Sequence, residues 1–170
     1  PYDDIVKRHA GKHGFDWALI VAMMYRESRF DPEVVSWAGA RGLMQVLPPT
    51  ARRFGVTNLE DPEMSVIAGV RMLDWLYQRM EPDLTVKDRT WFALAAYNAG
   101  LGHLIDARRL AQEKGLNPDR WFGNVEKAML LLSQPAYYRK ARHGYVRGAE
   151  PVTYVRDIRT LYNAYRAALP

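Results

Sequence analysis

Apolar residues recur at intervals of three and four positions along most of the chain, a spacing typical of helices with one buried face. This pattern predicts a mainly α-helical fold with little strand. The expected helices run from Asp3 to about Lys12, from Asp16 to about Arg29, from Asp61 to about Met80, and over about 89–100, 101–114, 124–133 and 150–168. Because no internal repeat or long linker interrupts the pattern, we expect a single domain over residues 1–170.

Local signals place the ends of several helices. Asp3 and Asp16 are expected N-caps, and Gly14 is expected to stop the first helix. The second helix should end at "FDP", residues 30–32, because the residue before a proline disfavours helix. The nearly all-apolar helix 89–100 should be buried on most sides. The inward candidates of the helix from Asp61 are Ile67, Val70, Met72, Leu73, Leu76 and Tyr77.

The main irregular element is "SWAGARGLMQVLPPT", residues 36–50. Two glycines three positions apart, followed by two adjacent prolines, predict a loop or small hairpin. A short helix over about 49–54 should follow it, because proline is favoured at the start of a helix.

The acidic residue Glu27 follows the most apolar run of the chain, residues 17–25. On a helix it shares a face with Ile20, Met23 and Met24, so its side chain should point toward the core. Desolvation and the negative end of the helix dipole both disfavour a carboxylate there, so we expect a raised pKa and a group that can donate a proton. Position alone leaves a second interpretation open, in which Glu27 turns to solvent or pairs with Arg29 or with another, more distant arginine.

Charge and composition limit the partners. A net charge of +5 and a pI near 9.5 favour an anionic partner such as nucleic acid, a membrane surface or an acidic wall polymer. The basic residues concentrate mildly in "YYRKARHGYVRG", residues 137–148, which has no nucleic-acid-binding motif and which we interpret as a solvated face. The apolar run 17–25 is too short to span a bilayer. The start at Pro1 indicates a mature or excised fragment.

Other polar residues give weaker signals. His9 and His13 have a spacing that can bind a metal, but no third ligand accompanies them, and we interpret them as a surface pair. Asp31 is the nearest candidate for a second carboxylate, and we interpret it as a turn or cap residue. With no cysteine and no phosphate-binding glycine loop, we expect no cofactor and no metal site.

Three motifs fall in register over most of the chain: "ESRFDP" at 27–32, "GARGLMQVLP" at 39–48 and "LAAYNAG" at 94–100. Together they resemble the goose-lysozyme-like lytic transglycosylase superfamily. The later stretch 131–159 resembles the catalytic module of the membrane-bound lytic murein transglycosylase F family. The resemblance implies a lysozyme-like (goose-type) helical fold, in which the loop or hairpin element lies beside a glycan-binding cleft.

The resemblance also implies a reaction. Glu27 matches the single catalytic acid of the family. It would protonate the glycosidic oxygen between N-acetylmuramic acid and N-acetylglucosamine, then remove the proton of the muramyl C6 hydroxyl, which closes on C1 and gives a 1,6-anhydro product. One carboxylate could suffice because the attacking hydroxyl belongs to the substrate and is already positioned.

The other residues of the motifs are implied to support Glu27 or bind substrate. The residues with these implied roles are Ser28, Ser36, Gln45, Tyr97, Asn98 and Tyr154. Ser28 would make a structural hydrogen bond near the helix end, Gln45 would offer its amide to substrate, and Tyr97 would bring its hydroxyl near Glu27. Asn98 would brace the loop after its helix. Leu47 stands where many relatives have Met, which keeps an apolar wall but puts the fine shape of the subsites in doubt.

The resemblance further implies a setting and partners. These are a periplasmic location, a full-length protein tethered to the outer membrane, an N-terminal solute-binding-like domain that regulates it, and peptidoglycan strands as substrate. We expect no nucleic acid partner and no membrane contact by this fragment. The alternatives are a goose-type lysozyme that hydrolyses the same bond, a noncatalytic wall-binding module, and a basic helical nucleic-acid binder.

Overall fold

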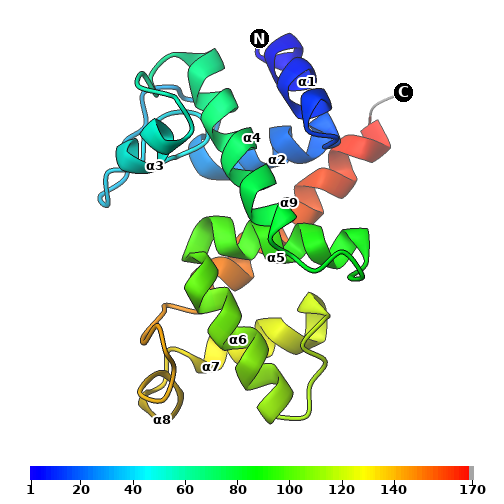
Figure 1. Ribbon diagram of the computed structural model, residues 1–170. Helices are drawn as coiled ribbons and strands as arrows, with labels where there is room; N and C mark the ends of the chain where they lie inside the picture. The colour runs from blue at the N-terminus through cyan, green and yellow to red at the C-terminus, as the bar shows by residue number, and fades with distance from the viewer. Residues whose placement is uncertain (169–170) are drawn as a thin grey trace. The chain divides into compact units, whose positions relative to one another are not determined.

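The computed structural model describes residues 1–168, which are mainly helical, as the periodicity predicts (Figure 1). No strand occurs among these residues, and isolated bridges pair Arg41 with Val35 and with Val46. Within them no helix is long and apolar enough to cross a membrane. The helices are α1 (Asp3–Lys12), α2 (Trp17–Ser28), α3 (Pro48–Arg53), α4 (Pro62–Gln78), α5 (Val86–Ala99), α6 (Leu101–Glu113), η1 (Trp121–Val125), α7 (Glu126–Leu131), α8 (Pro135–Tyr138) and α9 (Ala149–Ala168).

The first two helices test the predicted caps. Asp16 caps α2 as predicted, because its Oδ1 accepts a hydrogen bond of 3.0 Å from the backbone N–H of Ala18. The prediction for Asp3 is wrong: it is the first helical residue, and the N-cap position falls on Tyr2 without a side-chain hydrogen bond. Asp3 still lies in the first turn, where a carboxylate interacts favourably with the helix dipole.

The end of α2 has a different cause from the one predicted. The helix stops at Ser28 because Arg29 (φ 52°) and Phe30 (φ 65°) both take left-handed backbone conformations. The helix therefore ends before Asp31, the residue at which Pro32 was expected to disfavour the helical conformation. Left-handed conformations are uncommon for residues with a Cβ, so the surroundings must hold this turn in place.

Helix α5 contains an unbroken run of buried residues. Every residue from Trp91 to Tyr97 is buried, as its apolar sequence predicts. Thr85 caps its start by accepting from the backbone N–H of Asp88, and Gly100 follows its last residue. In α4, Val70, Leu73 and Leu76 are buried as predicted. The other three inward candidates are half-buried, namely Ile67, Met72 and Tyr77.

Two elements near the end of the chain depart from the predicted pattern. The helix expected over 124–133 is present but shorter, since α7 covers only Glu126–Leu131. It follows η1, in which Phe122 and Gly123 leave the helical conformation. The short helix α8 lies at the start of the basic stretch 137–148 and was not predicted. It begins at Pro135, where a proline costs the helix no hydrogen bond.

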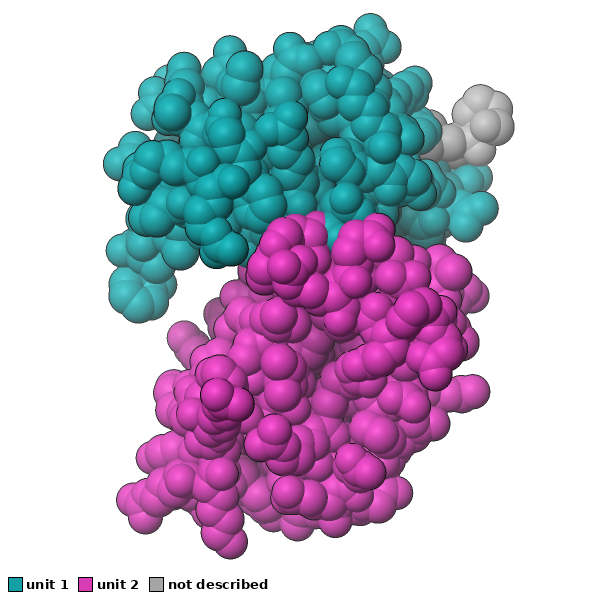
Figure 2. Space-filling model, viewed as in Figure 1, with its two compact units in different colours: residues 1–74, 157–170 teal, residues 75–156 magenta. Residues whose placement is uncertain are grey.

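The chain forms two compact units, coloured separately in Figure 2. Among the described residues, unit 1 comprises 1–74 and 157–168, and unit 2 comprises 75–156. Within unit 1, α1 packs against α2. Within unit 2, α6 packs against α5, η1 and α7. Glu27 and the loop that follows α2 belong to unit 1.

Candidate active site

Glu27 lies in the last turn of α2, half-buried. The residues that share its face, Ile20, Met23 and Met24, are all buried to within 1% of full burial. The apolar side predicted from the sequence is therefore present. A carboxyl at the C-terminal end of a helix, next to such a face, is in a position to act as a proton donor and acceptor.

The two arginines beside Glu27 have other partners. Arg26 Nε lies 3.0 Å from Asp157 Oδ2. The Arg29 guanidinium lies over the ring of Tyr25, 5.6 Å from its centroid. Arg29 makes no ion pair within the residues that the structure describes, so the pairing of Glu27 with Arg29, one form of the second interpretation, does not occur.

Ser28 joins the end of α2 to the following loop. Its hydroxyl is buried and lies 3.1 Å from the carbonyl oxygen of Met24 and 2.9 Å from that of Leu43. The bond to Met24 is local to the helix, whereas the bond to Leu43 spans fifteen positions of sequence. The loop that carries Gly42 and Gln45 is therefore held directly against the turn that carries Glu27.

The loop itself is built from short-range hydrogen bonds. Ser36 and Ala40 are joined twice, since the Ser36 N–H donates to the Ala40 carbonyl and the Ala40 N–H donates to Ser36 Oγ. The Gly42 N–H donates to the carbonyl of Val34. Gly42 has φ 79°, and a Cβ there would collide with the carbonyl oxygen of Leu59. Only glycine fits this position, because any other residue would be both strained and obstructed.

Gln45 supports the loop from inside. Its Nε2 donates hydrogen bonds of 2.9 Å to the carbonyls of Val34 and Gly42, and its own backbone has φ 51°. The amide nitrogen is thus used within the protein. A contact between Gln45 and substrate stays a prediction, and Oε1 is the atom that would make it.

Trp37 is a candidate that the sequence interpretation missed. Its side chain is fully exposed, at 101% of the reference value, at the tip of the tight turn 36–40. Val35 and Leu47 on the same segment are also about half exposed. The available signal was an indole placed in a turn rich in glycine, where no helix or strand could bury it.

The remaining motif residues lie in unit 2. Tyr97 on α5 and Tyr154 on α9 are buried, Tyr154 completely. Asn98 is exposed, and its side chain makes no hydrogen bond to any residue that the structure describes, so the expected brace of the next loop is not seen. Because Glu27 lies in unit 1, the approach of Tyr97 and Tyr154 to its carboxyl stays a prediction.

The structure also tests the interpretations given to Asp31, His9 and His13. Asp31 is exposed, and its Oδ1 accepts from the N–H of Glu33 at 2.9 Å, which is the turn role predicted for it. The surface interpretation of His9 is wrong: it is buried, and Nε2 lies 2.9 Å from Glu63 Oε1. That hydrogen bond, together with Arg8, lowers the pKa of the Glu63 carboxyl. His13 Nδ1 is 2.9 Å from Asp74 Oδ2.

No group of three potential metal ligands occurs within residues 1–168. Each histidine of the pair on α1 instead contacts one carboxylate, since His9 binds Glu63 and His13 binds Asp74. The candidate site thus consists of a single half-buried carboxyl, the loop hydrogen-bonded to its helix, and polar groups on that loop.

Comparison with known proteins identifies the class of protein to which this helical fold and its half-buried carboxyl belong. The transglycosylase SLT domain family matches residues 4–119, and the chain belongs to that family. The chain is 46% identical to the membrane-bound lytic murein transglycosylase F of Pseudomonas fluorescens over 162 residues, which are 95% of this chain and 33% of that protein. It is also 46% identical to the protein of the same name from Maricaulis maris, over 99% of this chain and 36% of the relative. The chain thus spans about a third of the length of these curated relatives.

Solved structures agree with this assignment. The 70 kDa soluble lytic transglycosylase SLT70 of Escherichia coli matches 96% of this chain and 24% of its own, with a TM-score of 0.60 and 25% identity. A complex of the 70 kDa soluble lytic transglycosylase with bulgecin A matches with a TM-score of 0.65 and 25% identity, over 98% of this chain and 24% of the other. The lysozyme-like helical fold expected from the resemblance is therefore confirmed.

Proposed function

We propose that this chain is the catalytic module of a peptidoglycan lytic transglycosylase. It would cleave the β-1,4 bond between N-acetylmuramic acid and N-acetylglucosamine without water. The observation that carries the proposal is the placement of Glu27 on the buried face of α2, in a chain that belongs to the SLT domain family. The relatives are named for lytic transglycosylase activity on murein.

The proposed reaction balances with one carboxyl. The protonated Glu27 gives its proton to the glycosidic oxygen as the bond from that oxygen to the muramyl C1 breaks. The resulting carboxylate takes the proton of the muramyl C6 hydroxyl, whose oxygen forms the new bond to C1. The carboxyl is regenerated, and no water is consumed. Hydrolysis usually needs a second carboxylate, which activates water or acts as the nucleophile. The proposed reaction consumes no water and does not need it.

The other residues divide into two roles. Ser28 acts as a positioning residue, because its hydroxyl fixes the Leu43 carbonyl against the end of α2. Ser36, Gln45 and the exposed indole of Trp37 lie on the loop held in this way, and we assign them to contacts with the glycan. The flat apolar face of an indole suits the C–H groups of a pyranose ring. Tyr97, Asn98 and Tyr154 complete the proposed site.

The setting belongs to the same proposal. The relatives are called membrane-bound, and this chain corresponds to a third of their length. We infer a periplasmic location, with outer-membrane tethering and a regulatory N-terminal solute-binding-like domain in the full-length protein. The net charge of +5 favours an anionic wall as the partner.

Mass spectrometry of the products tests the reaction. Purified peptidoglycan is digested in water enriched in ¹⁸O, and the muramyl ends are analysed. We expect 1,6-anhydro ends without label. Labelled reducing ends would instead identify a hydrolytic, goose-type lysozyme.

Two variants test the catalytic group. Glu27→Gln should abolish product release, because an amide can neither donate nor accept the proton. Glu33→Gln is the matched control, since Glu33 is an exposed glutamate of the same unit, and it should leave product release unchanged. Unchanged release by Glu27→Gln, or none by the native chain, would favour a noncatalytic wall-binding module.

A further inference from the structure

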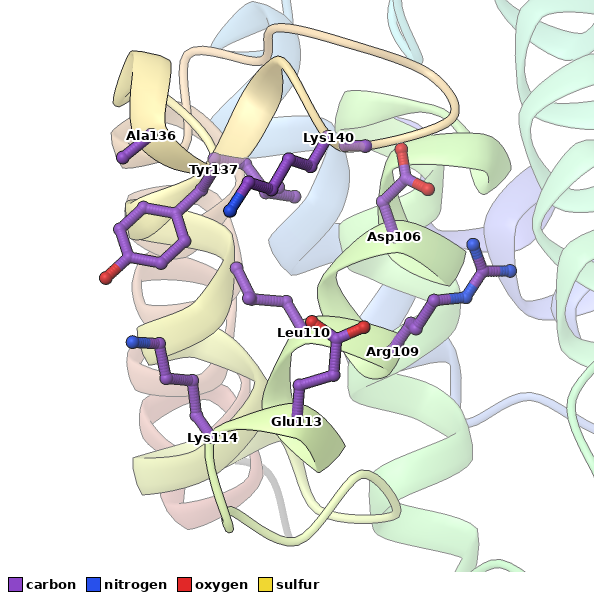
Figure 3. Close-up of a pocket in the computed structure, with 10 residues that line it drawn as sticks. Asp106, Arg109, Leu110, Glu113, Lys114, Ala136, Tyr137 and Lys140 are labelled. Atoms are coloured by element: carbon purple, nitrogen blue, oxygen red, sulfur yellow. The ribbon is translucent and has the colours of Figure 1, made fainter.

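Unit 2 contains a hollow that the proposed reaction does not use. It lies between α6 and the segment around α8, with a volume of about 380 Å³ (Figure 3). Pockets of a few hundred Å³ are typical of small-ligand sites in proteins. All its lining residues fall within 106–141 of unit 2. None of them belongs to the three motifs at 27–32, 39–48 and 94–100, although the lining residues from Leu132 to Ala141 lie in the later stretch 131–159 that resembles the transglycosylase F family. The proposed reaction assigns no role to any of them.

Unpaired cations surround the hollow. Arg109, Lys114 and Lys140 line it, and none of them makes an ion pair within the residues that the structure describes. Arg108, one position away, contrasts with them, since it binds both Glu81 and Asp119. Cations gathered at a concave surface without carboxylate partners attract an anionic ligand.

The two acidic residues that line the hollow differ in whether their carboxylates can contact a ligand. Asp106 is only 4% exposed, and its Oδ2 accepts a hydrogen bond of 2.8 Å from the backbone N–H of His143. Glu113 is exposed and makes no ion pair within the described chain. The hollow thus offers three cations and one accessible carboxylate, a pattern that fits a ligand with several carboxylates and an amino group.

The hollow also has an apolar side. Leu110, Leu132 and Tyr137 line it, and the Lys114 ammonium lies 4.8 Å from the centroid of the Tyr137 ring. In Figure 3 the ammonium groups of Lys114 and Lys140 lie on the side of Tyr137, whereas Arg109 and Asp106 lie on the opposite side. A ligand bound there would contact charged side chains and apolar side chains at the same time. A short peptide with carboxylates and aliphatic groups has the chemistry for both.

We propose that this hollow binds the carboxylate-bearing stem peptide of the cell wall. The inference rests on the proposed function, which makes peptidoglycan the substrate. A stem peptide with a diamino acid carries carboxylates for the cations and an ammonium for Glu113. The basic stretch 137–148 thus contributes Tyr137 and Lys140 to a binding site, instead of forming only the solvated face that we expected from the sequence.

Calorimetric titration tests the site without using activity. The probe is the tripeptide L-alanyl-γ-D-glutamyl-meso-diaminopimelate, titrated into the native chain and into the double variant Lys114→Gln with Lys140→Gln. We expect at least about tenfold weaker binding by the variant, because charge-assisted contacts to carboxylates are lost. The control is Lys87→Gln with Lys127→Gln, which removes two exposed lysines of the same unit that do not line the hollow and should keep native affinity.

Two further ligands define the chemistry. The tripeptide with all carboxylates amidated should not bind, and an L-peptide of equal charge should bind more weakly than the stem peptide. Equal affinity for the amidated form, unchanged affinity of the double variant, or no binding of the stem tripeptide to the native chain would overturn the proposal. Equal binding of the L-peptide would overturn the assignment to the stem peptide.

A second assay separates this inference from the proposed function. Glycan strands freed of stem peptides are digested by the native chain and by the Lys114→Gln, Lys140→Gln variant. Equal release of anhydro products by both is expected. Loss of anhydro products from both, with stem-peptide binding intact, would refute the proposed function and leave the binding site standing.

Discussion

Replacing Ser28 with alanine tests how the loop is held to the helix that carries Glu27. The Ser28 hydroxyl lies 2.9 Å from the Leu43 carbonyl oxygen, and Leu43 has no exposed surface. In Ser28→Ala this carbonyl stays buried without its donor, which costs about 1–3 kcal/mol. The higher helix propensity of alanine offsets at most about 0.5 kcal/mol of that cost. A net loss of about 0.5–3 kcal/mol in the free energy of unfolding follows.

Urea denaturation measures this loss. The midpoint should fall while the slope stays unchanged, because the surface exposed on unfolding is nearly the same. For a chain of this size the melting temperature should fall by about 1–12 °C, at about 2–4 °C per kcal/mol.

Ser133→Ala is the matched control. Its hydroxyl also donates to a backbone carbonyl, that of Leu130 at 2.9 Å, but in an exposed position where water can replace it. The control should change the free energy of unfolding by less than about 0.5 kcal/mol. If Ser28→Ala and Ser133→Ala have equal effects, the bond to Leu43 does not hold the loop.

Three further predictions concern the loop and the pH dependence. Gly42→Ala should destabilise the chain by more than about 3 kcal/mol, seen as a lower urea midpoint, because a Cβ would collide with the Leu59 carbonyl at φ 79°; a loss below about 1 kcal/mol would refute the claim that only glycine can be accommodated at position 42. Trp37→Ala should raise the KM for glycan strands while the melting temperature stays unchanged, whereas Tyr145→Ala, another exposed aromatic residue, should alter neither. The lowered pKa of Glu63 means that its contribution to stability is complete above about pH 4.5 and is lost as pH falls through the lower folded value. Melting temperatures of the native chain and Glu63→Gln should therefore differ most above pH 4.5 and converge in acid, and a constant difference would contradict the assignment.

Helical periodicity was enough to predict most of the fold. The caps at Asp16 and Gly100 and the burial of α5 follow from local rules, because they depend on residues within one turn of each other. The left-handed turn at Arg29 and Phe30 was missed, because positive φ is uncommon for residues with a Cβ and no local signal marks it. The kink at Gly123 was also missed, although a glycine is the residue that takes its φ of 74° without strain. Asp3 failed as a cap for a smaller reason, because the helix begins at that residue itself.

The candidate site divides in the same way. The sequence by itself determined the class of protein and the proposal that Glu27 is the catalytic acid, because the motif spacing and an acid on an apolar face are properties of the chain order. Only the tertiary structure decided which atoms hold the loop: Ser28 reaches Leu43, and Gln45 uses its amide nitrogen on Val34 and Gly42. It also brought Lys114, the residue that caps the C-terminal end of α6, beside Tyr137 of α8, because contacts between distant segments depend on how helices pack and not on the order of residues.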